Sequence, residues 1–147
     1  MNENNLVEIL MIEDSAEDAE LALRALKENK IANAIHLIKD GAEALDFVFC
    51  SGKYAGRDFK NPPKIILLDL KLPKVDGIEV LRRIKSDERT KIIPVIVLTS
   101  SKEEQDIIMS YKLGVNSYIV KPVNFEKFVV VMKNLELYWL LTNKSPV

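Results

Sequence analysis

The sequence predicts an α/β protein in which five parallel strands form one sheet, with helices on both of its faces. Three observations support this fold class. Short apolar runs alternate five times with longer segments of helical spacing. The runs at 65–68 and 95–98 are apolar throughout, as is typical of parallel strands buried on both faces. All five glycines lie beside apolar runs, so we interpret them as turn or loop residues that separate the secondary-structure elements.

The first part of the chain is predicted to contain two strands and two helices. The apolar run at 6–12 is the first strand, and Ser15 begins a capping signal for a helix with leucines at helical spacing. A weaker strand at 34–38 precedes a helix that opens at 40–43. The connection at 50–64 contains two glycines and two prolines, so it is predicted to be a surface loop.

The next two strands, at 65–68 and 95–98, are each followed by a helix. The segment 76–79 caps the first of these helices. The second helix is predicted to begin at Ser101 and to stop at Gly114.

A short fifth strand at 118–120 precedes a long last helix that Asn124 caps, and residues 142–147 are expected to fray. The residues expected to pack on the sheet are Phe125, Phe128, Val129, Met132, Leu135 and Trp139. A second apolar ridge lies on roughly the opposite side and consists of Val130, Leu137 and Leu141. Such a ridge favours a protein partner, for example in a homodimer. The alternative is that it packs against the chain's own tail.

The amino-acid composition excludes several classes of protein. At 147 residues and 48% hydrophobic content, residues 1–147 are expected to form a single domain with its own core. The 21 basic and 22 acidic residues nearly cancel, which argues against a nucleic-acid partner. One cysteine and one histidine exclude a disulfide framework and a two-histidine metal site. The sequence has no signal peptide and no run long enough to span a membrane, so we expect a cytoplasmic protein without a membrane partner.

Polar side chains follow four of the predicted strands where each strand ends. Glu13 and Asp14 follow the first strand, Asp69 the third, Thr99 the fourth and Lys121 the fifth. The carboxyl ends of parallel strands meet at one edge of the sheet, where ligands bind in such folds. We therefore expect these side chains to lie together.

Several carboxylates at one edge are costly without a cation. Two carboxylates about 4 Å apart repel each other by roughly 4 kcal/mol at an effective dielectric constant near 20. A hard divalent ion with oxygen ligands removes this cost, and Mg²⁺ commonly uses one or two carboxylates together with waters and phosphate oxygens. The cluster thus predicts a magnesium-assisted phosphate site.

The same residues, with the motifs around them, resemble the receiver domain of two-component response regulators. The matching segments are Glu13-Asp14 after LVEILMI, Asp69 in IILLDLKLPKVDG, Thr99 in VIVLTSS and Lys121-Pro122 in SYIVKP. Each motif is weak by itself, but together they are specific and cover nearly the whole chain. The resemblance implies a flavodoxin-like sheet with strand order 2-1-3-4-5 and five helices.

Three further features are similar to a narrower group, the single-domain regulators of the cyanobacterial-phytochrome type. They are the extended loop at 50–63, the sequence NPP before the third strand, and Trp139. This likeness implies a sensor histidine kinase of the phytochrome type as partner, and the last helix is a candidate surface for docking it.

For the site, the resemblance implies that Asp69 accepts a phosphoryl group from a phosphohistidine of the kinase. Mg²⁺ would be bound by Asp14, Asp69 and the backbone carbonyl of Lys71, with Glu13 acting through a water. Lys121 and the metal would neutralise the phosphoryl oxygens during transfer.

The resemblance also implies a conformational output. Thr99 would hydrogen-bond the phosphoryl group, Tyr118 would rotate inward, and the face of the fourth strand, fourth helix and fifth strand would change for partner binding or phosphorelay. A fixed, half-buried Tyr118 is an equally good interpretation of the sequence. The Lys121-Pro122 bond is expected to be cis.

Three other functions fit the sequence less well. A phosphatase of the haloacid-dehalogenase type also uses an aspartyl nucleophile, but it needs a second aspartate at the position of Lys71. A flavin binder would place an anion-binding loop where Glu13 and Asp14 stand. The complete site disfavours a receiver that has lost phosphorylation. We therefore expect a signalling phosphoprotein that is not a turnover enzyme and catalyses only its own phosphotransfer and slow autodephosphorylation.

Overall fold

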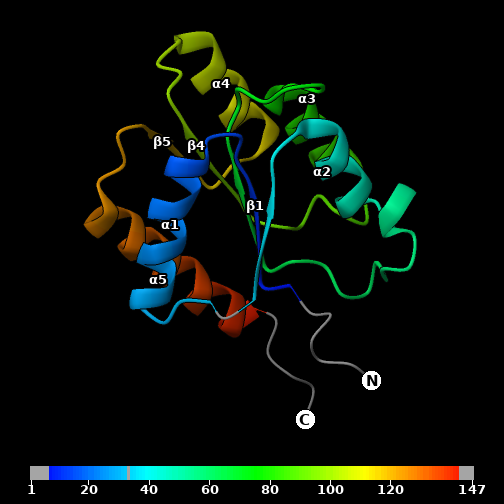
Figure 1. Ribbon diagram of the computed structural model, residues 1–147, viewed down its shortest axis with the longest axis horizontal. Helices are drawn as coiled ribbons and strands as arrows, with labels where there is room; N and C mark the ends of the chain where they lie inside the picture. Colours follow the sequence, from blue (N-terminus) through cyan, green and yellow to red (C-terminus); the bar gives the residue numbers. More distant parts are fainter. Residues whose placement is uncertain (1–6, 33, 143–147) are drawn as a thin grey trace.

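The computed structural model describes residues 7–32 and 34–142, and it contains a five-stranded parallel sheet with the order β2-β1-β3-β4-β5. Figure 1 shows the sheet at the centre of the molecule. The strands are β1 (Ile9–Ile12), β2 (Ile35–Ile38), β3 (Ile65–Leu68), β4 (Val95–Thr99) and β5 (Ser117–Val120). The fold class and the strand order predicted from the sequence are confirmed.

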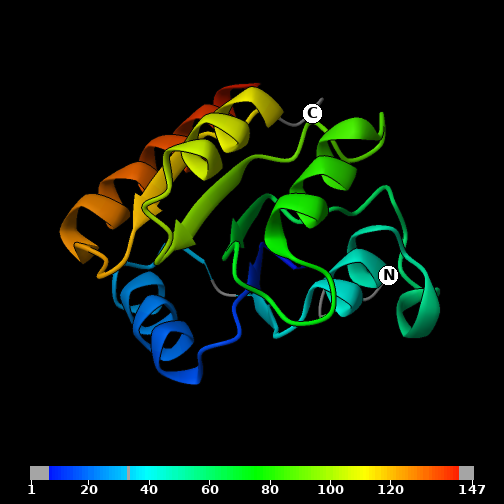
Figure 2. The same ribbon diagram turned by 90° about the horizontal axis from the view of Figure 1, so that it is seen from above.

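Five α-helices cover the two faces of this sheet. They are α1 (Ala16–Glu28), α2 (Gly41–Val48), α3 (Gly77–Ser86), α4 (Glu104–Leu113) and α5 (Phe125–Thr142). Helices α1 and α5 pack on one face, while α2, α3 and α4 lie on the other, as Figure 2 shows from above. None of the helices within the described residues is long and apolar enough to cross a membrane.

Short polar residues begin four of the helices as the sequence predicts. The side chain of Ser15 accepts a hydrogen bond from the first turn of α1, and Asp40, Asp76 and Asn124 do the same for α2, α3 and α5. Each bond satisfies a backbone N–H that has no partner within its helix. These caps fix where each helix starts after the loop at the carboxyl edge of the sheet.

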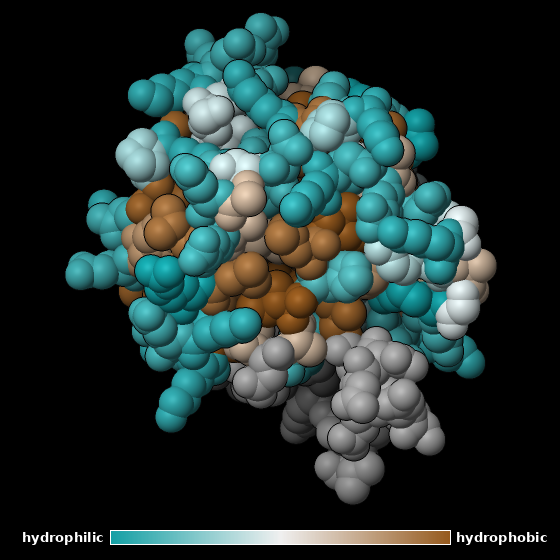
Figure 3. Space-filling model, viewed as in Figure 1, coloured by the Kyte–Doolittle hydropathy of each residue, from teal (hydrophilic) through white to brown (hydrophobic). Residues whose placement is uncertain are grey.

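The strands differ in burial according to their place in the sheet. All residues of β1, β3 and β4 are buried, whereas the edge strand β2 is mostly half-buried. Figure 3 shows apolar side chains gathered in the middle of one face. Residues of the central strands are buried between two helical layers, which explains their continuous apolar runs.

Two predicted boundaries are wrong by three residues, while three strand ends at β2, β4 and β5 differ by one. Strand β1 begins at Ile9 instead of residue 6, which lies outside the described residues. Helix α4 begins at Glu104, three residues after the predicted start at Ser101. The hydroxyl of Ser101 donates to Asp106 and accepts from the backbone N–H of Glu103, so it links the loop before the helix to the first turn of α4.

The connection at 50–64 is more ordered than the predicted loop. It contains a 3-10 turn, η2 (Gly52–Tyr54), and the hydroxyl of Tyr54 donates to Glu43 of α2 at 2.6 Å. The guanidinium of Arg57 lies 3.7 Å from the ring centre of Phe47. Aromatic and charged contacts of this kind, which a count of glycines and prolines does not reveal, bind the connection to α2.

The last helix agrees with the predicted pattern where its side chains are described. Phe128 and Met132 are fully buried against the sheet, and Val130 is 57% exposed. Thr142, the first residue of the tail expected to fray at 142–147, is the last residue of α5. The remaining predictions for this region lie outside the described side chains or residues; they concern Leu137, Trp139, Leu141 and residues 143–147.

Candidate functional site

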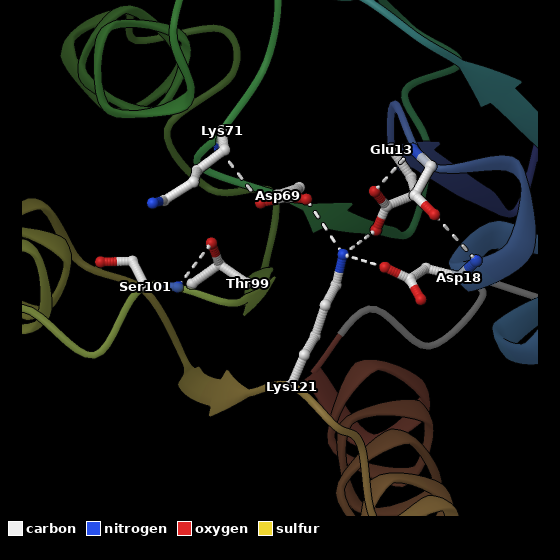
Figure 4. A network of polar contacts seen from close by, with 8 residues as sticks. Glu13, Asp18, Asp69, Lys71, Thr99, Ser101 and Lys121 are labelled. Atoms are coloured by element: carbon white, nitrogen blue, oxygen red, sulfur yellow. Dashed lines mark hydrogen bonds and ion pairs between the residues drawn. The ribbon is translucent and has the colours of Figure 1, made fainter.

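The predicted convergence at the carboxyl edge of the sheet is present. Glu13 directly follows β1, Asp69 follows β3, and Lys121 follows β5. The ammonium of Lys121 lies 2.7 Å from Oε1 of Glu13 and 3.0 Å from Oδ2 of Asp69 (Figure 4). Parallel pairing of adjacent strands brings these groups together although Glu13 and Lys121 are 108 positions apart.

A third acid that sequence reasoning missed also contacts this lysine. Oδ2 of Asp18 lies 2.8 Å from Nζ of Lys121. Asp18 belongs to the first turn of α1, where its backbone N–H donates to the cap residue Ser15. One feature of the sequence could have revealed this contact: α1 begins directly after β1, so its first turn lies at the carboxyl edge of the sheet, where the other strands end. Helix capping alone accounts for an acid at this position, which concealed the contact.

The other predicted metal ligands lie around Asp69 in different ways. The backbone N–H of Lys71 donates to Oδ1 of Asp69 at 3.0 Å, which orients the carboxylate. Asp14 is exposed to solvent, and the carboxylates that contact Lys121 are instead those of Glu13, Asp18 and Asp69. Within the described residues, no group of three or more His, Cys, Asp or Glu side chains could hold a metal ion.

This donor set fits magnesium better than a transition metal. Mg²⁺ commonly needs only one or two carboxylates, because waters and phosphate oxygens complete its octahedron. Three carboxylates share the ammonium of Lys121, and Asp14 adds a fourth acid next to Glu13. The site therefore carries an excess of negative charge that a hard divalent cation would reduce.

Burial and charge shift the pKa values of the three central groups. Burial raises the pKa of Glu13 to about 6, with a contribution from the nearby Asp69 carboxylate, against the hydrogen bond from Lys121. Burial also acts to raise the pKa of Asp69, but hydrogen bonds from the Lys71 backbone, Lys121 and Thr99 outweigh it and hold the pKa below its usual value. The three carboxylates likewise outweigh burial at Lys121 and raise its pKa. The lowered pKa favours the ionised form of Asp69 at neutral pH.

Glu13 should make stability fall with pH. Its pKa is raised from 4.5 to about 6 in the folded protein, so the folded state binds this proton more tightly than the unfolded chain does. The contribution to stability is full below the unfolded pKa and is lost as the pH rises through the folded pKa. Between pH values near 4 and 8, we expect the Glu13→Gln variant to gain about 2 kcal/mol in free energy of unfolding relative to the original chain.

Urea denaturation at several pH values measures this difference. The control is Glu17→Gln, which removes an exposed carboxyl from the first turn of α1. Its pH profile should run parallel to that of the original chain. If the Glu13→Gln profile is also parallel, burial of Glu13 does not raise its pKa.

Thr99 and Tyr118 lie on the far side of Asp69 from Glu13. Thr99 is fully buried, and its hydroxyl accepts a hydrogen bond from the backbone N–H of Ser101 at 3.4 Å. The half-buried Tyr118 donates its hydroxyl to the backbone oxygen of Ser101 at 3.0 Å, so it packs against the loop between β4 and α4. The rotation of Tyr118 stays a prediction. The expected cis bond at Lys121-Pro122 is present.

A cavity of about 200 Å³ adjoins the carboxylates on the side of α1. Leu21 and Ala22 of α1 line it together with Val123 and Phe125, and Asp69 lies at its polar end.

Comparison with known proteins identifies one matching family and several similar proteins. The family model described as the response regulator receiver domain matches residues 9–133. The probable methanogenesis regulatory protein FilR2 of Methanothrix harundinacea is 41% identical over 94% of this chain and 86% of its own length. Response regulator Rcp1 of Synechocystis sp. is 41% identical over 94% of this chain and 92% of its own length.

Solved structures agree with these matches. The Mn(2+)-bound form of Rcp1 has a TM-score of 0.76, with 95% of this chain and 98% of that chain covered at 40% identity. The phosphorylated cyanobacterial phytochrome response regulator RcpA has a TM-score of 0.77, with 97% and 99% covered at 40% identity.

Proposed function

Since the chain belongs to the family of response regulator receiver domains, we propose that Asp69 accepts a phosphoryl group from a phosphohistidine of a sensor histidine kinase. The observation that carries this proposal is the environment of Asp69, which is 7% exposed, is held by the Lys71 backbone and Lys121, and has a pKa that these hydrogen bonds keep below its usual value. An oxygen of Asp69 forms a bond to phosphorus while the bond from phosphorus to the imidazole nitrogen breaks. The imidazole retains the electron pair.

The charge that develops during this transfer needs compensation. Lys121 already lies 3.0 Å from Asp69, so it can bind a phosphoryl oxygen without a large movement. Asp14, Asp69 and the backbone carbonyl of Lys71 would hold Mg²⁺, with Glu13 acting through a water. The bound ion would neutralise phosphoryl oxygens. The excess of acids in the site and the Mn(2+)-bound form of the relative Rcp1 support this proposal.

The product would serve as a switch. Hydrolysis in the manner of an aspartyl phosphatase needs an acid two residues after the nucleophile, and Lys71 stands there. Thr99 would bind the phosphoryl group, and the loop that Tyr118 contacts through Ser101 would then move. The surface of β4, α4 and β5 would change for partner binding or phosphorelay.

We further propose a kinase of the phytochrome type, acting in the cytoplasm, because RcpA is a phytochrome response regulator by description. A homodimer through α5 and the face of β4 and β5 is proposed as well. The exposed Ile108 and Tyr111 of α4 and Val130 of α5 support it. Sedimentation equilibrium should give twice the chain mass, and Val130→Glu should lower it. A monomeric mass at all concentrations would contradict the dimer.

Incubation with phosphoramidate and Mg²⁺, followed by intact mass measurement, tests the phosphoacceptor role. We expect the mass of one phosphoryl group to be added, and chelation of the metal to prevent the addition. If no phosphoryl group is added and beryllium fluoride shows no Mg²⁺-dependent binding, the switch is not present in this protein.

A further inference from the structure

Asp18 contacts the site, but the proposed function assigns it no role. We propose that Asp18 is a positioning residue for phosphoryl transfer, which acts by holding the ammonium of Lys121 in place. This inference rests on the proposed function, because it concerns the rate at which Asp69 is phosphorylated.

Each N–H group of the Lys121 ammonium can be paired with its own carboxylate acceptor. A lysine ammonium has three N–H donors, and three carboxylates accept from it: Glu13 at 2.7 Å, Asp18 at 2.8 Å and Asp69 at 3.0 Å. The acceptors come from the end of β1, the first turn of α1 and the end of β3. Figure 4 shows Asp18 and Asp69 on opposite sides of the ammonium, so Asp18 restrains it from the side away from the nucleophile.

Of the three acids, Asp18 is suited to be the anchor that does not change during the reaction. Asp69 is the reacting group and becomes bonded to phosphorus. Glu13 also accepts from the backbone N–H of Ser15, and the proposed function has it act on the metal through a water. Asp18 is held by the capped turn of α1, since its backbone N–H donates to the Ser15 hydroxyl at 3.2 Å.

An anchor matters because of the length of the lysine side chain. Lys121 reaches Asp69 along a flexible four-carbon stem, and transfer needs its charge at the phosphoryl oxygens. A carboxylate that holds the ammonium before the donor arrives removes part of the cost of ordering this side chain. The Lys121 side chain is 14% exposed, in keeping with a restrained group.

The competing interpretation is that Asp18 only stabilises the start of α1, as any acid in a first helical turn can. Glu17 provides a matched control, because it lies in the same turn and is exposed. Glu17→Ala and Asp18→Ala each remove one negative charge from this turn. The two interpretations therefore differ in what they predict for these two variants.

The experiment measures the rate of phosphorylation by phosphoramidate with Mg²⁺ as a function of donor concentration. We expect Asp18→Ala to lower the maximal rate about tenfold and to leave the half-saturating donor concentration within about twofold. Glu17→Ala should keep the original rate, and Asp18→Glu should recover most of it. In a Lys121→Ala background, the loss of Asp18 should have no further effect, because the two residues act as a unit.

The outcomes distinguish a failure of the positioning role from a failure of the proposed function on which it rests. If the original chain is not phosphorylated, the proposed function fails. If it is phosphorylated but Asp18→Ala reacts as fast as Glu17→Ala, or faster, only the positioning role is wrong. An undiminished effect of Asp18→Ala in the Lys121→Ala background also contradicts it. Thermal unfolding monitors the fold, and Asp18→Asn replaces the alanine variant if that variant does not fold, with a slower rate again expected.

Discussion

Asp69→Asn is expected to abolish phosphorylation of this protein. The amide has the size of the carboxylate and can still accept from the Lys71 backbone, which lies 3.0 Å from Oδ1. It lacks the negative charge that makes the oxygen a nucleophile, so the rate should fall by on the order of a thousandfold or more. Intact mass after reaction with phosphoramidate and Mg²⁺ should show no phosphoryl group.

The fold of this variant should persist, because the substitution removes one of three acids that share Lys121 and leaves Glu13 and Asp18 in place. Asp58→Asn is the matched control, since it makes the same chemical change at an exposed position in the 50–64 connection. This control should be phosphorylated like the original chain. A phosphoryl group on the Asp69→Asn variant would mean that another residue is the acceptor.

Gly41→Ala is expected to destabilise this protein strongly. A Cβ atom at Gly41 would lie 1.8 Å from the backbone oxygen of Val75 and 2.7 Å from its carbonyl carbon. The backbone N–H of Gly41 also donates to the oxygen of Pro73, so α2 begins directly against the loop that follows β3. Because backbone atoms cannot swing aside, we expect a loss of about 3 kcal/mol in free energy of unfolding.

Gly56→Ala is the control for this prediction. A Cβ atom at Gly56 meets nothing within 4 Å, so the change should stay within about 0.5 kcal/mol. Urea denaturation of both variants measures the contrast. If the two variants are equally stable, the close approach of α2 to Val75 does not constrain the fold.

The fold class and the convergence of Glu13, Asp69 and Lys121 could be predicted from the sequence alone. Continuous apolar runs in β1, β3 and β4 predicted strands buried on both faces, which the structure confirms. Glu13, Asp69 and Lys121 were found because parallel strands place their carboxyl ends at one edge. These inferences succeed because they depend on local periodicity and on a general property of parallel sheets.

The long-range contacts of Gly41 and Asp18 could not be predicted from the sequence and are visible only in the folded structure. The sequence predicts Gly41 only as a residue between two elements, whereas its contact with Val75 depends on how α2 packs against the loop after β3. Asp18 is explained in the sequence by helix capping, and its ion pair with Lys121 joins residues 103 positions apart. The physical reason is that capping and hydrophobic periodicity are local, whereas these contacts depend on how packing orients one element against another.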